Sequence, residues 1–372
     1  MKIGIPAETR LEETRVAATP ETVKKLVAAK HQVIVQSGAG VTSIVIDAAY
    51  QAAGARLGAA ADAFGCDMVL KVRAPSAEER TLIKSGTVVV GMLNPFDADN
   101  IAAMATHGLT AFALEAAPRI TRAQSMDVLS SQANIAGYKA VLLATNAYGR
   151  FMPMLMTAAG TVKAARVLIM GVGVAGLQAI ATAKRLGAVI EASDVRPPVK
   201  EQVESLGAKF LDVPFVTDEE REIAQGAGGY ARSMPVDWMR RQAELVHARA
   251  KQADIVITTA LIPGRKAPIL ISEGTVKAMK PGSVIVDMAA EQGGNCALSE
   301  SGKTVTKYGV HIIGDSNLAT LVAADASALY SRNVLDFLKL IIDTDANLAI
   351  NREDEIVAAT LLCAGGEIIK KS

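Results

Sequence analysis

Residues 165–196 read ARVLIMGVGVAGLQAIATAKRLGAVIEASDVR, and this stretch decides the fold. Its apolar run Val167–Met170 suits a buried parallel strand, and it leads directly into a G-x-G-x-x-G motif that opens an apolar helix. A second strand, Ala188–Ala192, ends two residues before Asp194. Because a glycine-rich motif alone also occurs in purely structural turns, the prediction depends on the whole order of elements. That order predicts a Rossmann unit that binds a dinucleotide.

The three glycines have different expected roles. Gly171 permits a tight turn, Gly173 lets the backbone approach a pyrophosphate, and Gly176 lets the helix pack closely on the strand. The free amides at the helix start attract the phosphates. Asp194 stands 18 residues after Gly176, where a carboxylate binds the adenosine ribose hydroxyls and repels a 2′-phosphate, so NAD(H) is favoured over NADP(H). Arg196 could accept such a phosphate, but beside Asp194 a surface or ribose-edge contact is favoured.

Length and composition narrow the class of protein. A chain of 372 residues predicts two domains, and its 50% hydrophobic content with few aromatics suits large parallel sheets. The balance of 39 basic and 38 acidic residues gives no indication of nucleic-acid binding. We expect no membrane span, because no apolar run reaches about 18 residues, and no signal peptide. The three cysteines, Cys66, Cys296 and Cys363, predict reduced buried thiols and no metal site.

Strands that alternate with short helices predict an α/β fold of two doubly wound, Rossmann-like domains with parallel sheets, and the cofactor in the cleft between them. Expected strands of the first domain are 2–5, 32–36, 68–72, 87–92 and 109–113. Expected strands of the second are 167–170, 188–192, 254–259, 283–288 and 310–313. A crossover helix at 125–148 and a return helix at 318–342 make the first domain discontinuous. We therefore expect residues 1–130 plus 320–372 in one domain and 131–319 in the NAD(H)-binding domain.

A polar segment follows the last strand of the first domain. Pro118–Gly137 reads PRITRAQSMDVLSSQANIAG and brings Arg119, Gln124, Asp127 and Ser130 to the start of the crossover helix. From the residues alone, a helix cap with an ordinary Arg119–Asp127 ion pair explains them as well as a binding site does.

Several blocks together resemble one protein family. They are PRITRAQSMDVLSSQANIAGY, GVGVAGLQAIATAKRLGA, VKEQVESLGAKF, GGYARSM, TTALIPGRKAP and MKPGSVIVDMAAEQGGNC. They are similar to the soluble NAD(H)-binding component of proton-translocating NAD(P) transhydrogenase, which lies in the alpha subunit and is a relative of alanine dehydrogenase. The resemblance runs from the N-terminal KIGIPAETR to about Asn333.

The resemblance implies roles for individual residues. Arg119 and Asp127 would bind the carboxamide and ribose region of NAD(H), with Ser130 nearby, and Gln124 would point toward NADP(H) on a partner component. Tyr230 would close over the nucleotide on a mobile loop within 217–239, although most loops of such length are surface excursions. The remaining implied NAD(H) contacts are Val174, Asp194, Val195, Arg196, Gly229, Gln242 and Leu261.

Alanine dehydrogenase shares ETRVAATP, the LKV at Lys71, the glycine turn and GSVIVDMAAEQGG with this chain, and is the main alternative. Its reaction needs proton transfers, and in that family a histidine follows the strand corresponding to 87–92. Here the strand continues VVVGMLNPF without histidine. Arg15 and Lys71 would bind substrate in that family, or form ion pairs within the fold. The four histidines are interpreted as structural. A third alternative, a catalytically silent NAD-binding module, would not need Arg119, Gln124 and Asp127 together.

Hydride transfer between two nicotinamides releases no proton, so it requires alignment of the rings and no general acid. The resemblance implies an Si/Re-specific transhydrogenase and two partners, an NADP(H)-binding component and a membrane component that carries the proton path. It also implies a homodimer, located in the cytoplasm and peripheral to the membrane through its partners. The chain could be a separate subunit or a segment of a longer polypeptide.

Overall fold

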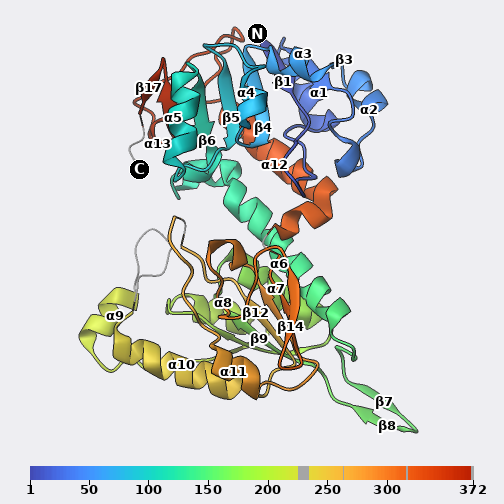
Figure 1. Ribbon diagram of the computed structural model, residues 1–372, viewed down its shortest axis with the longest axis vertical. Coiled ribbons are helices and arrows are strands. Elements are labelled where there is room, and N and C mark those ends of the chain that lie inside the picture. Colours follow the sequence, from blue (N-terminus) through green and yellow to red (C-terminus); the bar gives the residue numbers. More distant parts are fainter. Residues whose placement is uncertain (225–233, 263, 316, 370–372) are drawn as a thin grey trace. The chain divides into compact units, whose positions relative to one another are not determined.

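The computed structural model describes residues 1–224, 234–262, 264–315 and 317–369. The chain divides into two compact units: unit 1 contains Met1–Gln132 and Ala319–Ser372, and unit 2 contains Ala133–Leu318. Each unit is built on one large, mostly parallel β-sheet with helices on its faces (Figure 1). The predicted α/β fold is therefore confirmed.

Unit 1 has an eight-stranded sheet in the order β17-β16-β6-β5-β4-β1-β2-β3. Its first six strands in sequence are parallel, and the two last strands add antiparallel to the edge at β6. The strands are β1(Lys2–Ile5), β2(Gln32–Gln36), β3(Arg56–Gly58), β4(Met68–Arg73), β5(Val88–Met92), β6(Thr110–Ala113), β16(Leu361–Ala364) and β17(Glu367–Ile368).

The two faces of this sheet bury different helices, because alternate residues of a strand point to opposite faces. Leu70 and Val90 pack with Tyr330 and Phe337 of α12 on one face, whereas Val89 packs with residues of α3 and α5 on the other. The helices and 3₁₀ turns are α1(Pro20–Ala28), η1(Val41–Ser43), α2(Asp47–Ala52), α3(Ala60–Phe64), α4(Ala77–Arg80), α5(Ala98–Thr106), η2(Leu114–Ala116), η3(Thr121–Met126), α12(Ala323–Leu338) and α13(Glu355–Thr360).

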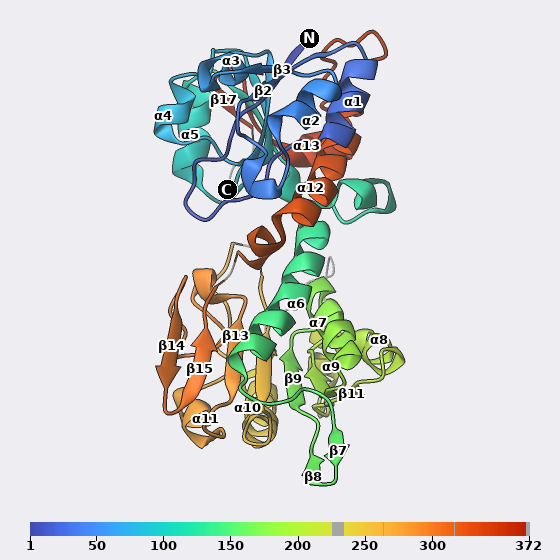
Figure 2. The same cartoon turned by 90° about the vertical axis from the view of Figure 1, so that its right-hand side faces the viewer.

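Unit 2 has a seven-stranded sheet in the order β11-β10-β9-β12-β13-β15-β14 and a separate two-stranded hairpin. In both views the hairpin extends away from the rest of the unit (Figures 1 and 2). The strands are β7(Leu155–Thr157) and β8(Gly160–Val162) of the hairpin, then β9(Arg166–Met170), β10(Val189–Ser193), β11(Lys209–Phe210), β12(Ile255–Thr258), β13(Val284–Asp287), β14(Thr304–Lys307) and β15(Val310–Ile313).

The strand β9 again separates two apolar layers. Val167 and Ile169 face a core formed with α6, α7 and α8, whereas Leu168 and Met170 face a core formed with α10 and α11. The helices and turns of unit 2 are α6(Val128–Ala147), which starts in unit 1, and α7(Val174–Arg185), α8(Val199–Ser205), α9(Asp218–Ala224), α10(Val236–Ala250), α11(Glu273–Ala278) and η4(Ala290–Gln292). The turn η5(Leu318–Val322) begins at the last residue of unit 2 and continues into unit 1.

Both sheets have the doubly wound strand order, in which the chain reverses direction across the sheet at one point. That point lies between β1 and β4 in unit 1 and between β9 and β12 in unit 2. In open α/β sheets, ligands bind outside the carboxyl ends of the strands at this switch point. The fold thus offers one such position in each unit.

Some sequence predictions were wrong in detail. The segment 217–239 is not one long loop, because α9 and the start of α10 lie within it. The sheets are not purely parallel: β14 pairs antiparallel with β15, β16 with β6, and β17 with β16. The crossover helix begins at Val128, after the 3₁₀ turn η3, and the return helix begins with the turn η5. Among the described residues, no helix is both long and apolar enough to cross a membrane.

Candidate functional site: the glycine turn of unit 2

The three glycines of the turn after β9 have different surroundings. Gly171 has a φ of 90°, in the left-handed region that favours glycine. A Cβ atom on Gly176 would lie 2.1 Å from the carbonyl oxygen of Gly171, so the helix could not pack there. A Cβ atom on Gly173 would meet no atom within 4 Å. The space above Gly173 is therefore open, as the approach of a phosphate to the backbone requires.

The N-terminus of α7 supplies the charge for such a phosphate. Gly173 precedes the helix as its N-cap and has no side chain to cap the first amides. An α-helix leaves its first four amides without internal partners and carries partial positive charge at that end. The turn and the helix start therefore form a ready anion site. Thr259, which follows β12, donates its hydroxyl to the Gly171 carbonyl at 2.8 Å, so the two loops of the switch point are joined.

Asp194, at the end of β10, is bound to the same turn. Its Oδ2 accepts the amide of Val172 at 2.7 Å, and Arg196 donates its amide and Nε to Oδ1, both at 2.9 Å. Arg196 Nη2 also lies 2.8 Å from Oδ2. The Asp194 side chain is 6% exposed and that of Arg196 is 21% exposed. The carboxylate therefore lies beside the glycine turn, where the sequence predicted a ribose ligand.

The other predicted nucleotide contacts of unit 2 differ in their surroundings. Val174 and Leu261 are exposed at the start of α7 and after β12. Val195 packs on a small cluster that contains Trp238. Gln242 is nearly buried on α10, and among the described residues no hydrogen bond joins it to the glycine turn. Gly229 and Tyr230 lie outside the described residues.

Substitution of Gly176 by alanine tests this geometry. The added methyl would lie 2.1 Å from the Gly171 carbonyl, a backbone atom that cannot move without opening the turn. We expect NADH affinity to fall at least 10-fold, which corresponds to about 1.4 kcal/mol, in a fluorescence titration. Gly149→Ala is the control, since a Cβ atom there would meet nothing within 4 Å. An unchanged NADH affinity of Gly176→Ala would contradict the proposed phosphate site.

The polar segment of unit 1 lies where the sequence predicted, between β6 and α6. Asp127 caps α6: its Oδ1 accepts the amide of Ser130 at 2.9 Å, and its Oδ2 accepts the Ser130 hydroxyl at 2.5 Å. The helix-cap interpretation of Asp127 agrees with these two contacts. Arg119 and Gln124 are exposed. The structure brings Asp127 and Ser130 into contact and leaves Gln124 on the surface of η3.

At the switch point of unit 1, charged side chains form ion pairs with one another. Lys71 of β4 is 1% exposed, and its Nζ lies 2.8 Å from Glu79 and 3.4 Å from Glu8. Glu13 binds Arg15 through two hydrogen bonds of 2.7 Å and also binds Arg73 at 3.1 Å. Burial raises the pKa of Glu8, which Lys71 only partly offsets. For Glu13, burial is outweighed by Arg15 and Arg73, which lower its pKa to about 2.

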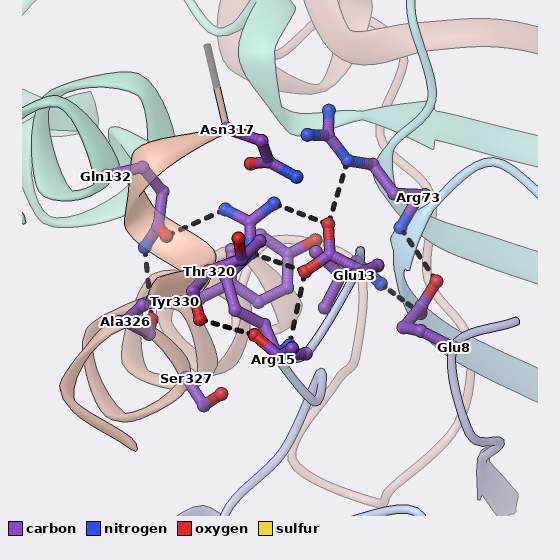
Figure 3. Close-up of polar contacts among 12 residues, drawn as sticks. Glu8, Glu13, Arg15, Arg73, Gln132, Asn317, Thr320, Ala326, Ser327 and Tyr330 are labelled. Carbon is purple, nitrogen blue, oxygen red and sulfur yellow. Dashed lines mark hydrogen bonds and ion pairs between the residues drawn. The ribbon is translucent and has the colours of Figure 1, made fainter. Parts of the chain in front are cut away.

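Arg15 also reaches α6 (Figure 3). Its Nη1 donates to Gln132 at 2.8 Å, and Gln132 in turn donates to the carbonyl of Ala326 in α12 at 3.0 Å. Arg15 and Lys71, which alanine dehydrogenases would use for substrate, thus have carboxylate partners within unit 1. The ion-pair interpretation of both residues agrees with these contacts.

The carboxyl of Glu115 lies beside the end of β5 and was not among the predicted site residues. Glu115 accepts the amides of Leu93 at 3.2 Å and Asn94 at 2.7 Å. Burial raises its pKa to about 7, although both amides oppose the shift. Leu93 and Asn94, which follow β5, stand where the alternative function would use a histidine.

The described residues contain no group of acidic, histidine and cysteine side chains that could hold a metal. Cys66, Cys296 and Cys363 are free and buried.

Comparisons with known proteins agree with this arrangement. The family model of the alanine dehydrogenase/PNT N-terminal domain matches residues 4–136, and that of the C-terminal domain matches residues 140–371. An NAD(P) transhydrogenase subunit alpha chain of Rhodospirillum rubrum is 52% identical and covers 99% of this chain and 98% of its own. An alanine dehydrogenase of Bilophila wadsworthia is 32% identical over 79% of this chain and 72% of its own.

A solved structure gives the same result. The transhydrogenase from Sinorhizobium meliloti has a TM-score of 0.90 and 50% sequence identity, and the match covers 99% of this chain and 100% of that one. The similarity to transhydrogenase alpha subunits is higher and more extensive than the similarity to the alanine dehydrogenase. The chain therefore belongs to the alanine dehydrogenase/PNT family.

Proposed function

We propose that this chain is the NAD(H)-binding component of a proton-translocating NAD(P) transhydrogenase of the Si/Re-specific type. The observation that carries the proposal is the glycine turn of unit 2, with open space above Gly173 and the Asp194 carboxylate bound to the same turn. A carboxylate in this position favours NAD(H) over NADP(H). The 52% identity to a transhydrogenase alpha subunit over nearly the whole chain supports the reaction.

Hydride passes directly from C4 of NADH to C4 of NADP⁺, so no proton is released in the chemical step. The protein contributes alignment and exclusion of water. Arg119 and Asp127 hold the carboxamide and ribose of the nicotinamide end, with Ser130 as the partner of Asp127. Gln124, exposed on η3, faces the NADP(H) that a partner component holds. Tyr230, outside the described residues, covers the bound nucleotide.

The proposal includes partners, because the hydride exchange itself lies near balance and a proton-translocating enzyme must couple it to proton movement. One partner component binds NADP(H), and a membrane component carries protons. The chain then works in the cytoplasm, peripheral to the membrane. We also propose a homodimer. The segment around the β7–β8 hairpin supports this, because Phe151, Met154 and Met156 are 57%, 62% and 70% exposed, which is unusual for large apolar side chains in one segment.

Gln124→Asn tests the division of roles. Because Gln124 is assigned to the second nucleotide, shortening its side chain should leave NADH affinity within about twofold and slow single-turnover hydride transfer to partner-bound NADP⁺ about 10-fold. Titration of NADH and stopped-flow transfer rates measure the two effects. Arg122→Ala is a suitable control, since Arg122 lies on the same turn and its side chain, 48% exposed, forms an ion pair with Asp354. A large loss of NADH affinity in Gln124→Asn would place Gln124 at the wrong nucleotide.

Alanine dehydrogenase is the alternative function, and the presence of Arg15 and Lys71 is the observation that favours it. The internal carboxylate partners of both side chains, and the absence of histidine directly after β5 in the described chain, argue against it. A catalytically silent NAD-binding module is a third candidate, and the combination of Arg119, Gln124 and Asp127 argues against that.

A further inference from the structure

Asn333 of α12 is a nearly buried amide that contacts the segment carrying Gln124 and Asp127. It is 8% exposed. Its Nδ2 donates to the carbonyl of Ser125 at 2.7 Å, and its Oδ1 accepts the hydroxyl of Ser131 at 2.7 Å. A buried amide is costly unless both halves are bonded, and here both are. Neither bond is local, because the partners lie more than 200 residues away in sequence.

The helix that carries Asn333 is itself rigidly held. Tyr330, Val334 and Phe337 of α12 are fully buried in the core of unit 1. The Tyr330 hydroxyl donates to the carbonyl of Lys71 at 2.6 Å. Asn333 is therefore a polar side chain on a fixed support, and its position is determined by the core.

The segment that Asn333 binds has weak internal hydrogen bonding. η3 is a six-residue 3₁₀ helix, a geometry with poor hydrogen bonds that rarely extends this far. Only Ala123 and Met126 of this turn are buried. Its last internal hydrogen bond, from the amide of Asp127 to the carbonyl of Gln124, measures 3.3 Å. The carbonyl of Ser125, directly after Gln124, is bonded instead by Asn333.

Asn333 thereby spans the joint between η3 and α6. Ser125 lies on the η3 side of this joint, and Ser131 lies in the first turn of α6. Asp127, between them, is the residue where the backbone changes direction, with φ −72° and ψ 89°. Arg122 of η3 also pairs with Asp354, but because the Arg122 side chain is 48% exposed this pair contributes little. The buried tie through Asn333 is the stronger constraint on this joint.

We propose that Asn333 is a positioning residue for hydride transfer, which acts by fixing the backbone between Gln124 and Asp127 through the Ser125 carbonyl. The inference rests on the proposed function, because it assumes that these two side chains align the nicotinamides. A misplacement of about 1 Å in such a site costs about 100-fold in rate. The expected result of losing the tie is therefore slow transfer with nearly normal NADH binding.

Asn333→Asp is the most informative variant. It keeps an acceptor for Ser131 and replaces the donor to Ser125 by a carboxylate oxygen, which repels the carbonyl. We expect hydride transfer to partner-bound NADP⁺ to fall at least 10-fold at about pH 8, with NADH affinity within about threefold. The introduced carboxyl is buried and faces a carbonyl, so its pKa is raised. As the pH falls, the introduced carboxyl becomes protonated and can donate a hydrogen bond to the Ser125 carbonyl. The loss of hydride-transfer rate relative to the unchanged chain should therefore become smaller toward about pH 5.5.

Ser331→Ala is the matched control, because Ser331 is also buried on α12 and bonds to Thr19, away from η3. Asn333→Ala provides the same test if the aspartate variant does not fold. No transfer by the unchanged chain would refute the proposed function itself. With the unchanged chain active, normal transfer by both Asn333 variants would overturn this inference. So would a rate loss matched by Ser331→Ala, or one with an equal loss of NADH affinity.

Discussion

Replacement of Asp194 by alanine is expected to weaken NADH binding about 10- to 100-fold and to change NADPH binding much less. Hydrogen bonds to a charged group contribute about 1.5 to 3 kcal/mol, which corresponds to this range of affinity. NADPH gains nothing from the carboxylate, because its 2′-phosphate is repelled there. The preference for NADH over NADPH should therefore decrease, as measured by fluorescence titration of both nucleotides.

The hydrogen bonds that Asp194 already makes affect the size of this expected loss of affinity. A carboxylate offers about four lone-pair positions, and in Asp194 all four are used, by the amide of Val172 and by three groups of Arg196. Under the proposed function, ribose hydroxyls that bind this carboxylate would have to displace hydrogen bonds from the Arg196 side chain. Because this exchange has a cost, the affinity loss in Asp194→Ala should fall nearer the lower end of the range.

Asp212→Ala is the matched control for Asp194→Ala. Asp212 forms a surface ion pair with Lys200 in the same unit, and such pairs contribute little. The thermal unfolding temperature of both variants must be measured, because Asp194 also binds the Val172 amide. An unchanged NADH/NADPH preference in a folded Asp194→Ala variant would contradict the assignment of this acid.

The second large effect concerns stability. Lys71→Ala is expected to lower the free energy of unfolding by about 3 to 5 kcal/mol, because it leaves two buried carboxylates without their cation. Lys71 Nζ lies 2.8 Å from Glu79 and 3.4 Å from Glu8, and all three side chains are almost fully buried. Urea denaturation followed by circular dichroism measures the effect. Trp238, the only tryptophan, lies in unit 2 and reports on that unit separately.

The pH dependence of this variant has a defined sign. Burial already raises the pKa of Glu8 above its unfolded value, and loss of Lys71 raises it further. When the pKa of a carboxyl is higher in the folded state than in the unfolded state, the folded state holds a proton at pH values where the unfolded state does not. Stability is therefore lost as the pH rises from the unfolded pKa to the folded pKa. The defect of Lys71→Ala should therefore be smaller at about pH 5 than at about pH 8. Lys25→Ala, which breaks an exposed pair with Glu21, should have little effect. A defect below about 1 kcal/mol in Lys71→Ala would contradict the argument.

The sequence predicted most of the fold because its signals were local. The run Val167–Met170, the glycine turn and Asp194 are adjacent in the chain, and the structure keeps them adjacent. The antiparallel strands β14, β16 and β17 were missed because they are only 4, 4 and 2 residues long, and such short strands have weak patterns. Helices α9 and α10 were missed because glycines at 226, 228 and 229 suggested one long loop.

The site was predicted less completely than the fold. Asp194 and the glycines are recognisable from their spacing, and Arg119, Gln124 and Asp127 from their resemblance to a family. Gln132, Asn333 and Glu115 could not be identified, because each binds a backbone carbonyl or amide of another segment, and Gln132 and Asn333 bind a side chain as well. A side chain that binds backbone leaves no complementary residue type at its partner position. Only the tertiary structure shows such contacts.

The most direct test of the account is a parallel assay of the pure chain with NADH. One reaction contains pyruvate and ammonium, and the other contains a transhydrogenase NADP(H)-binding component loaded with NADP⁺. We predict NADH oxidation only with the NADP⁺-loaded component, with one NADPH formed for each NADH consumed. Oxidation with pyruvate and ammonium alone would contradict the account, and would identify an alanine dehydrogenase whose proton donor is a group other than a histidine after β5.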